Sequence, residues 1–448
     1  MDLLRSIFKG DKVIWIIFLF LCLISVTEVF SAAASLSYKS GDHWAPITRH
    51  GILLMVGVGL MVVTHNIQYK WFSAIPVFLL PASIVLLVMV TAVGVSVGDA
   101  SRWISVMGFT FQPSELAKMA VVIAVAYILS KGQNEHGASP NAFRYIMIIT
   151  CLVCGLILPE NLSTAALLFG VVYLMMIIGR VSFRKLLIPV IVVAGLVAAG
   201  VAFHLAVKNV DLQESSLLSR ADTWVARIVR FMDEDTKVPA AEFKVTDQNA
   251  QVTHARIAVA TSNIIGKGPG NSIQRDFLSL SFSDFIYAII LEELGLLPAA
   301  FVVFLYIVLL IRVGRIARKC DRTFPAFLVI GISLLLVSQA MFNMMVAVGL
   351  APVTGQPLPL ISMGGTSIWI NCIYIGMILS VSRYTAKLDE QRAALEAQRL
   401  HDAQIPMEVT TGSDFTDNDF PTGSGFVTDA QTSEEPTSQM LNSDEEFE

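Results

Sequence analysis

The sequence has few charged residues, and this shortage limits the classes of protein it can encode. Only 15% of the 448 residues are charged, whereas 54% are hydrophobic, and the mean hydropathy is +0.66. A soluble globular protein has about 25% charged residues. The composition therefore excludes an ordinary soluble domain and predicts an integral membrane protein, with membrane lipid around it and no nucleic acid as a partner.

Cofactor and disulfide patterns are also missing. The five cysteines lie in or beside apolar runs and do not suggest a disulfide framework. Cys151 and Cys154 form a C-x-x-C pair inside one such run, and we interpret them as two small packing residues. The seven histidines have no ligand spacing, and neither a P-loop nor a dinucleotide-binding fingerprint occurs. No metal site is predicted.

Long apolar runs are what the sequence has instead. A helix that crosses a bilayer needs about 20 apolar residues, and the chain has ten suitable runs. Small residues after the first run resemble a signal-peptide cleavage site, but that run is longer than a typical signal sequence, so we expect a retained helix. The predicted spans are 13–34, 49–64, 71–93, 115–130, 143–159, 162–179, 186–207, 285–311, 325–350 and 366–383.

Basic residues predict the orientation of these spans. They concentrate in alternate short loops, for example Arg180, Arg184 and Lys185 in one and Arg312 and Arg315 in another. Loops rich in Lys and Arg face the cytoplasm. The predicted fold is therefore an all-α integral membrane protein with ten transmembrane helices and both termini cytoplasmic. One long extracytoplasmic loop spans 208–284, and the shorter outer loops are 94–114 and 351–365.

Composition also divides the chain. Residues 1–12 form a cytoplasmic N-terminus, 13–383 form the membrane domain, and 384–448 form a cytoplasmic tail. The tail is predicted to begin as a solvated helix and to continue as a disordered acidic segment, since no Lys or Arg follows Arg399. It is either a docking segment for cytoplasmic partners or a solvated tail with no specific role.

The first polar segment on the predicted outer side covers residues 98–118. Arg102 lies in the outer loop, and Pro113 precedes a helix that Ser114 is predicted to cap. Glu115 and Lys118 follow at i and i+3, on one helix face. Charged groups within a membrane span usually face a cavity or pathway. A substrate site is therefore favoured over a purely structural ion pair.

The second polar segment is the long outer loop. Arg220, Arg227 and Arg230 recur there at helical spacing. Guanidinium groups bind phosphate and pyrophosphate through paired hydrogen bonds, although a solvated helix face explains the spacing equally well. The loop continues through Gln251 to alternating glycines and ends at Asp284. A carboxylate at a membrane boundary is a candidate site residue.

The third polar segment, residues 352–367, is rich in glycine, proline and small polar residues. Ser362, Gly364, Gly365 and Thr366 lie near its end. Irregular backbone at membrane depth is tolerated only where protein or a water-filled cavity surrounds it. This segment is therefore predicted to re-enter the membrane and line the same cavity as Asp284.

Together these motifs resemble the SEDS family (shape, elongation, division and sporulation), and most closely its cell-division branch. The resemblance covers residues 13–383. It rests on R-W with Q-P-S-E-L-x-K at 102–118, A-R-I-x-x-F at 226–231, G-x-G-x-G-N-S-x-Q at 266–274, D-F-I with E-E-L-G at 284–295, and L-P-L-I-S-x-G-G-[ST]-S at 358–367.

The resemblance implies a peptidoglycan glycosyltransferase that polymerises lipid II into glycan strands during septal cell-wall synthesis. It implies Asp284 as general base, with undecaprenyl pyrophosphate as leaving group, and Arg102, Lys118 and Arg227 as candidates to hold the pyrophosphate. A divalent cation, Mg²⁺ or Mn²⁺, is an alternative holder of that charge, although no motif specifies one. Further implied substrate-binding residues are Gln112, Ser114, Glu115, Arg220, Gln251, Lys267, Gly268, Gln274, Ser362, Gly364, Gly365 and Thr366.

The resemblance also implies a place and partners. The protein is expected in the bacterial cytoplasmic membrane at the division septum, with a class B penicillin-binding protein and other division proteins. Two departures are visible. The family's H-T-D-F is Phe282–Phe285 here, so no histidine can assist the base, and its P-D-x-G-T is replaced by residues 160–164. A lipid II flippase and a non-catalytic division scaffold are the alternative functions.

Overall fold

The computed structural model describes residues 9–32, 44–93, 95–97, 100–106, 109–134, 137–207, 249–278 and 282–404. By its internal contacts the chain divides into a large unit, Met1–Ala393, and a small unit, Ala394–Glu448. The predicted site residues Arg220 and Arg227 lie outside the described ranges. The large unit contains the rest of the candidate site.

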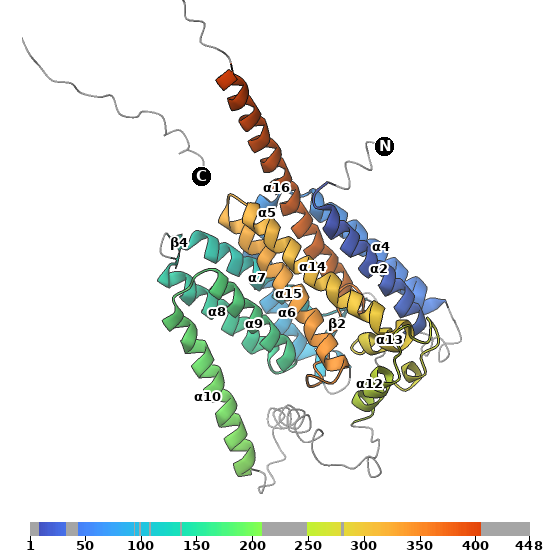
Figure 1. Cartoon of the computed structure of the whole chain (residues 1–448). Coiled ribbons are helices and arrows are strands. Elements are labelled where there is room, and N and C mark those ends of the chain that lie inside the picture. The colour runs from blue at the N-terminus through green and yellow to red at the C-terminus, as the bar shows by residue number, and fades with distance from the viewer. Residues whose placement is uncertain are drawn as a thin grey trace, which may run out of the picture. The chain divides into compact units, whose positions relative to one another are not determined.

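Helices dominate the large unit, as the apolar runs predict (Figure 1). Within the described ranges, seven of them are long and apolar enough to cross a membrane, which confirms a multi-pass helical fold. The count of ten spans and the sidedness stay predictions. The helices are α2 (Lys12–Ala32), α4 (Ala45–Asn66), α5 (Tyr69–Phe72), α6 (Ile75–Val93), α7 (Pro113–Lys131), α8 (Pro140–Ile157), α9 (Leu162–Ile178), α10 (Phe183–Val207), α12 (Ala250–Ala260), α13 (Ile286–Leu294), α14 (Leu296–Lys319), α15 (Thr323–Ala347) and α16 (Thr366–Gln404), with a 3₁₀ turn at Gln274–Asp276.

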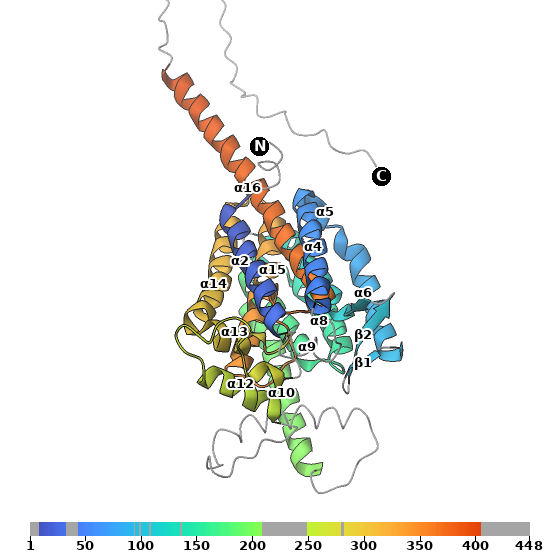
Figure 2. The ribbon, with the colours of Figure 1, turned by 90° about the vertical axis from the view of Figure 1, so that its right-hand side faces the viewer.

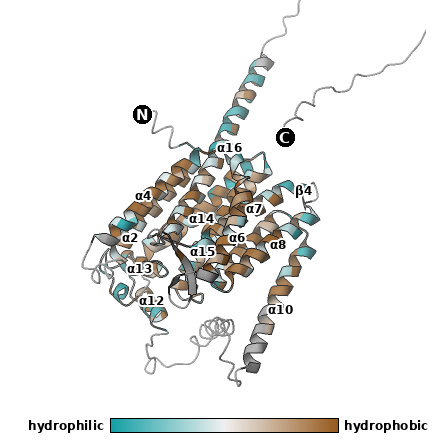
Figure 3. Cartoon of the chain, turned by 180° about the vertical axis from the view of Figure 1, so that it is seen from behind, coloured by the Kyte–Doolittle hydropathy of each residue, from teal (hydrophilic) through white to brown (hydrophobic). Residues whose placement is uncertain are grey.

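The core of the large unit forms around α7 and α15. In the most apolar part of α7, 78% of the residues are buried, against 22% for the apolar span Tyr69–Val90, which covers α5 and most of α6. A helix that is apolar all round is suited to complete enclosure. Figures 1 and 2 show α15 near the middle of the large unit with other helices around it, and Figure 3 shows apolar residues, in brown, along the peripheral helices. Hence α7 places its few polar side chains in the interior.

The predicted span 285–311 is not one helix, and this is a correction. It breaks at Gly295, where φ is +93° and α13 gives way to α14. Gly295 packs against Gly266, and a Cβ on Gly295 would lie 2.4 Å from the Gly266 nitrogen. Only glycine permits this contact between two backbones. An apolar run cannot reveal such a break, because hydropathy is continuous across it.

The outer loop 94–114 also differs from the prediction, because it contains a small antiparallel sheet. The strands are β1 (Val95–Val97), β2 (Ala100–Val106) and β3 (Phe109–Phe111), in the order β1-β2-β3. Ser105 pairs with Thr110. Apolar and polar residues alternate from position 104 to 106 and from 109 to 111, which is typical of strands. A second, two-stranded sheet joins β4 (Gln133–Asn134) and β5 (Gly137–Ala138).

Helix α16 runs without a break through the predicted boundary between membrane domain and tail. Considered alone, the small unit is described only for Ala394–Gln404, which is helical. The predicted acidic segment lies outside the described residues. The division of the chain at residue 384 therefore stays a prediction.

Candidate functional site

Asp284 lies in a turn directly before α13, and its side chain is half-buried. Its Oδ1 accepts a hydrogen bond from the Ser283 hydroxyl at 3.0 Å. The next residue, Phe285, is almost completely buried. The turn therefore holds the carboxylate at the edge of the protein interior.

The segment 352–365 packs against this turn, whereas its re-entry into the membrane stays a prediction. The Ser362 hydroxyl donates to the carbonyl of Ser283 at 2.6 Å and accepts from the amide of Leu358 at 2.7 Å. The amide of Met363 donates to the carbonyl of Phe282 at 2.9 Å. Ser362 is therefore adjacent to Asp284 in space, although 78 positions separate the two residues.

Two amide side chains of α15 join the segment to the turn. Asn343 Nδ2 donates to the carbonyl of Asp284 at 2.8 Å and to that of Gln356 at 2.7 Å. One helical turn away, Gln339 Nε2 donates to the carbonyl of Pro357 at 3.0 Å. Both side chains are buried. Neither residue is among the predicted site residues, although two amides at i and i+4 in an apolar span indicate a polar contact with another element.

Glu115 and Lys118 form the ion pair that their spacing predicts. The Nζ–Oε1 distance is 2.8 Å, and the side chains are 3% and 0% exposed, respectively. Lys118 Nζ also donates to Gln339 Oε1 at 2.9 Å. A continuous set of contacts thus leads from the ion pair through Gln339 to Pro357. Because Lys118 is enclosed, it can act on the site in this conformation only through Gln339.

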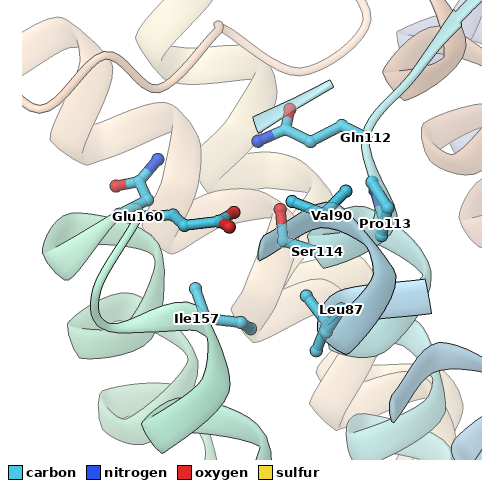
Figure 4. Close-up of a pocket in the computed structure, with 8 residues that line it drawn as sticks. Leu87, Val90, Gln112, Pro113, Ser114, Ile157 and Glu160 are labelled. Atoms are coloured by element: carbon cyan, nitrogen blue, oxygen red, sulfur yellow. The ribbon is translucent and has the colours of Figure 1, made fainter. Parts of the chain in front are cut away.

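A small cavity lies beside the start of α7 (Figure 4). Its volume is about 10 Å³, which is room for about one water molecule. Figure 4 shows the Glu160 carboxylate directed toward Ser114, with Gln112 nearby. Within the described ranges, the Ser114 hydroxyl and the Asn161 Nδ2 have no hydrogen-bond partner although both are buried. The remaining lining residues are Leu87, Val90, Pro113 and Ile157.

The predicted capping role of Ser114 is wrong. The residue that precedes α7 is Gln112, and Ser114 is the second residue inside the helix. Pro113 occupies the first position, where its missing N–H costs no hydrogen bond. In contrast, Asn161, in the segment that departs from the family pattern, caps α9 by accepting from the amide of Thr164 at 3.1 Å.

Glu292 anchors the glycine-rich loop 263–278 to α13. Its carboxylate contacts Lys267 Nζ and the Ser272 hydroxyl, both at 2.5 Å. It also accepts from the amides of Ile273 and Gln274 at 3.3 and 3.2 Å. Burial raises the pKa of Glu292, but these hydrogen bonds outweigh burial and hold the pKa below its ordinary value.

Glu293 anchors the same loop from the neighbouring position. It accepts from the amides of Gly270 and Ser272 at 2.9 and 3.1 Å and from the Ser31 hydroxyl of α2 at 2.5 Å. Arg275 Nη1 lies 3.8 Å from its carboxylate. This arrangement ties α2, α13 and the loop together at one point.

Several predicted substrate residues belong to this anchor. Lys267 pairs with Glu292, and the amide of Gly268 donates to the carbonyl of Glu293 at 2.7 Å. Gln274 Oε1 contacts His254 Nδ1 at 2.8 Å. These polar groups position the loop, and their contact with substrate stays a prediction.

The other predicted residues are distributed over three elements. Arg102 lies on β2 and Gln251 on α12. Gly364 and Gly365 precede α16, which begins at Thr366. In the part of the chain that the structure describes, no group of three or more His, Cys, Asp and Glu residues could hold a metal ion. The divalent cation stays a prediction.

Comparison with known proteins agrees with this architecture. Residues 11–387 match the family model of FtsW, RodA and SpoVE, described as cell cycle protein. The probable peptidoglycan glycosyltransferase FtsW of Geobacter sulfurreducens is 30% identical over 382 residues, which are 84% of this chain and 96% of the relative. The FtsW of Bacillus subtilis is 31% identical over 345 residues, which are 75% of this chain and 81% of the relative.

Solved structures share the fold. A chain from a peptidoglycan synthase complex, described for its coordination of polymerization and crosslinking, has a TM-score of 0.64 at 23% identity. The comparison covers 84% of this chain and 99% of that one. The rod shape determining protein RodA of Thermus thermophilus has a TM-score of 0.57 at 20% identity and covers 84% and 97% of the two chains. The chain therefore belongs to the FtsW, RodA and SpoVE family of cell cycle proteins.

Proposed function

We propose that this chain is a peptidoglycan glycosyltransferase that polymerises lipid II, with Asp284 as the general base. The family and the names of its FtsW relatives support the activity. The observation that carries the assignment of Asp284 is its setting. Polar contacts from α15 and from the segment 352–365 fix the backbone on which the half-buried carboxylate stands. Catalytic groups require such fixed positions.

In the proposed reaction, the C4 hydroxyl of an acceptor sugar attacks the anomeric carbon of the donor. The Asp284 carboxylate takes the hydroxyl proton as the new glycosidic bond forms. The bond to undecaprenyl pyrophosphate breaks, and its electron pair leaves with the pyrophosphate. Positive charge near that group stabilises the transition state.

Of the three cations that the family resemblance suggests for the pyrophosphate, Arg102 and Arg227 suit direct contact better than Lys118. Lys118 is enclosed and already paired with Glu115. We assign it the task of holding Gln339, which in turn holds the carbonyl of Pro357. Lys118 is thus a positioning residue for the segment beside Asp284.

The proposed partners are a class B penicillin-binding protein and other division proteins, at the septum of the cytoplasmic membrane. The similar synthase complex, which coordinates polymerization with crosslinking, supports a transpeptidase partner. An exposed apolar group is a candidate contact surface for this partner. Ile264 and Ile265 are 66% and 84% exposed, and the amides of Leu296 and Leu297 donate to the carbonyls of Asn263 and Ile264. Exposed apolar patches often mark protein interfaces.

The test is polymerisation of purified lipid II by the full chain with its cognate transpeptidase. We expect Asp284→Asn to lower polymerisation by about 100-fold or more, because a general base contributes 10²- to 10⁴-fold. Asp276→Asn is the matched control, since Asp276 is an exposed acid of the same loop. Polymer at the wild-type rate from Asp284→Asn would overturn the base assignment. Lipid II movement across vesicles without any polymer would favour the flippase.

A further inference from the structure

A second polar pocket lies between α5 and α16, at the end of the large unit opposite α13, the helix that follows Asp284 (Figure 1). Its volume is about 240 Å³. We call it the α5–α16 pocket. The lining residues are Gln68, Tyr69, Lys70, Ser380, Arg383, Tyr384 and Lys387.

The walls of the α5–α16 pocket are held by specific contacts. The Arg383 guanidinium donates to the side-chain and backbone oxygens of Asn66 at 3.2 and 3.0 Å. The Ser380 hydroxyl donates to the carbonyl of Ile67 at 2.5 Å. The rings of Tyr69 and Tyr384 lie 4.4 Å apart. The loop after α4 is therefore fixed to α16, and the pocket is part of the packed structure.

The charge of the α5–α16 pocket has one sign. Lys70, Arg383 and Lys387 line it, and none of the lining residues is acidic. Within the described ranges, no carboxylate forms an ion pair with any of the three cations. An acid outside the lining, Asp321, accepts a hydrogen bond from the Tyr384 hydroxyl. Three cations from two elements around one open space suit an anionic ligand.

The position of the pocket indicates where that anion comes from. The apolar part of α16 ends at Ser382, immediately before Arg383. Trp71, beside Lys70, is 70% exposed. Tryptophan and tyrosine concentrate at membrane–water interfaces, with Lys and Arg at the level of the lipid headgroups. The distribution of basic residues predicts that this end faces the cytoplasm.

We propose that the α5–α16 pocket binds the phosphate of an anionic phospholipid headgroup from that leaflet. Basic pockets between helices on the cytoplasmic side are suited to such headgroups. A water molecule takes about 30 Å³ in the liquid, so the pocket volume corresponds to several water molecules. This is enough room for a phosphodiester with its glycerol. This site is independent of Asp284 and of the polymerase reaction.

The direct test is retention of lipid by the full chain in zwitterionic micelles, measured by native mass spectrometry. We expect phosphatidylglycerol to be retained in preference to phosphatidylcholine. The double variant Lys70→Gln/Lys387→Gln should weaken phosphatidylglycerol binding by about 25-fold, because each cation near an anionic headgroup contributes about fivefold. Lys131→Gln/Arg184→Gln, which removes two exposed charges at the predicted cytoplasmic side, is the matched control and should leave binding unchanged.

A second measurement separates a lipid from a soluble phosphate compound. Thermal stabilisation by phosphatidylglycerol, but not by millimolar inorganic phosphate, identifies the lipid headgroup. Stabilisation by inorganic phosphate that the double variant loses identifies a soluble ligand and overturns the lipid source. Equal retention of the two lipids, or an equal loss in the control pair, overturns the site. If the double variant does not fold, the single variant Lys70→Gln answers the same question.

Discussion

Two irregular segments flank Asp284, and they are held by opposite chemistry. The loop 263–278 is held by carboxylates, whereas the segment 352–365 is held by neutral amides and hydroxyls. In the loop, the groups that need partners are backbone N–H donors at positions 270, 272, 273 and 274. Carboxylates, which only accept when ionised, match them.

The segment 352–365 has the opposite requirement, because its backbone carbonyl oxygens need hydrogen-bond donors. Prolines at 352, 357 and 359 have no N–H, so these three positions present only carbonyl oxygens. Side-chain donors satisfy them. Pro357 receives a hydrogen bond from Gln339, Pro359 from the hydroxyl of Tyr306, and Ile361 from Ser25 at 2.8 Å. The composition of each segment thus determines the kind of side chain that the surrounding helices must supply.

We expect the largest effect from removing a carboxylate of α13 that holds the loop 263–278. Glu292→Ala leaves the half-buried Lys267 ammonium, the Ser272 hydroxyl and two backbone amides without their acceptor. We expect a loss of about 5 kcal/mol in the free energy of loop closure, at the upper end for breaking a buried ion pair. Limited proteolysis should show cleavage within 263–278 while the helices stay intact. Glu396→Ala, an exposed acid on α16, should leave the pattern unchanged.

The pH dependence of the same anchor follows from the lowered pKa of Glu292. A carboxyl with a depressed pKa stabilises the folded state fully above its unfolded pKa and loses this contribution as pH falls through the folded pKa. Protease resistance of the loop should therefore stay constant from neutral pH down to the ordinary pKa of glutamate and fall only below it. A decline that begins near neutrality would contradict the assigned contacts.

The second-largest effect is expected from breaking the Glu115–Lys118 ion pair, which contacts the segment 352–365 through Gln339. Lys118→Met leaves the Glu115 carboxylate buried without its cation, which we expect to cost about 3 kcal/mol. The double variant Glu115→Gln/Lys118→Met removes both charges and should recover most of that loss. Thermal unfolding and polymerisation are the two measurements. Equal, mild effects of Glu115→Gln, Lys118→Met and the double variant would show that the pair is uncoupled.

The sequence could predict the elements and the local pair, because both depend on short-range patterns. Apolar runs mark most of the helices, and the i, i+3 spacing marks Glu115 with Lys118. The partners of Gln339 and Asn343 could not be predicted, since they depend on how distant elements pack. The break at Gly295 was hidden for the same reason, because it depends on contact with Gly266.

A smaller effect is expected from a neutral donor on α15. Asn343→Ala leaves the carbonyls of Asp284 and Gln356 without their donor, and an unsatisfied buried group costs about 1–3 kcal/mol. Polymerisation should fall more than stability, because the turn that carries Asp284 loses a support. Ser333→Ala on the same helix is the control, since that hydroxyl donates to the carbonyl of Ile330 of its own helix at 3.0 Å. A similar loss of activity in both variants would argue against a specific role for Asn343.

The smallest effect is predicted where a carboxylate has no donors to satisfy. Glu28 of α2 is completely buried, and within the described ranges neither of its oxygens has a hydrogen-bond partner. It lies close enough to Glu293 for the two carboxyl groups to repel each other. We therefore expect Glu28→Gln to leave the thermal unfolding midpoint unchanged or raise it, whereas Glu293→Gln should lower it, because Glu293 accepts from Gly270, Ser272 and Ser31. Equal destabilisation by the two substitutions would mean that burial alone, and not the set of donors around a carboxylate, determines its contribution to the fold.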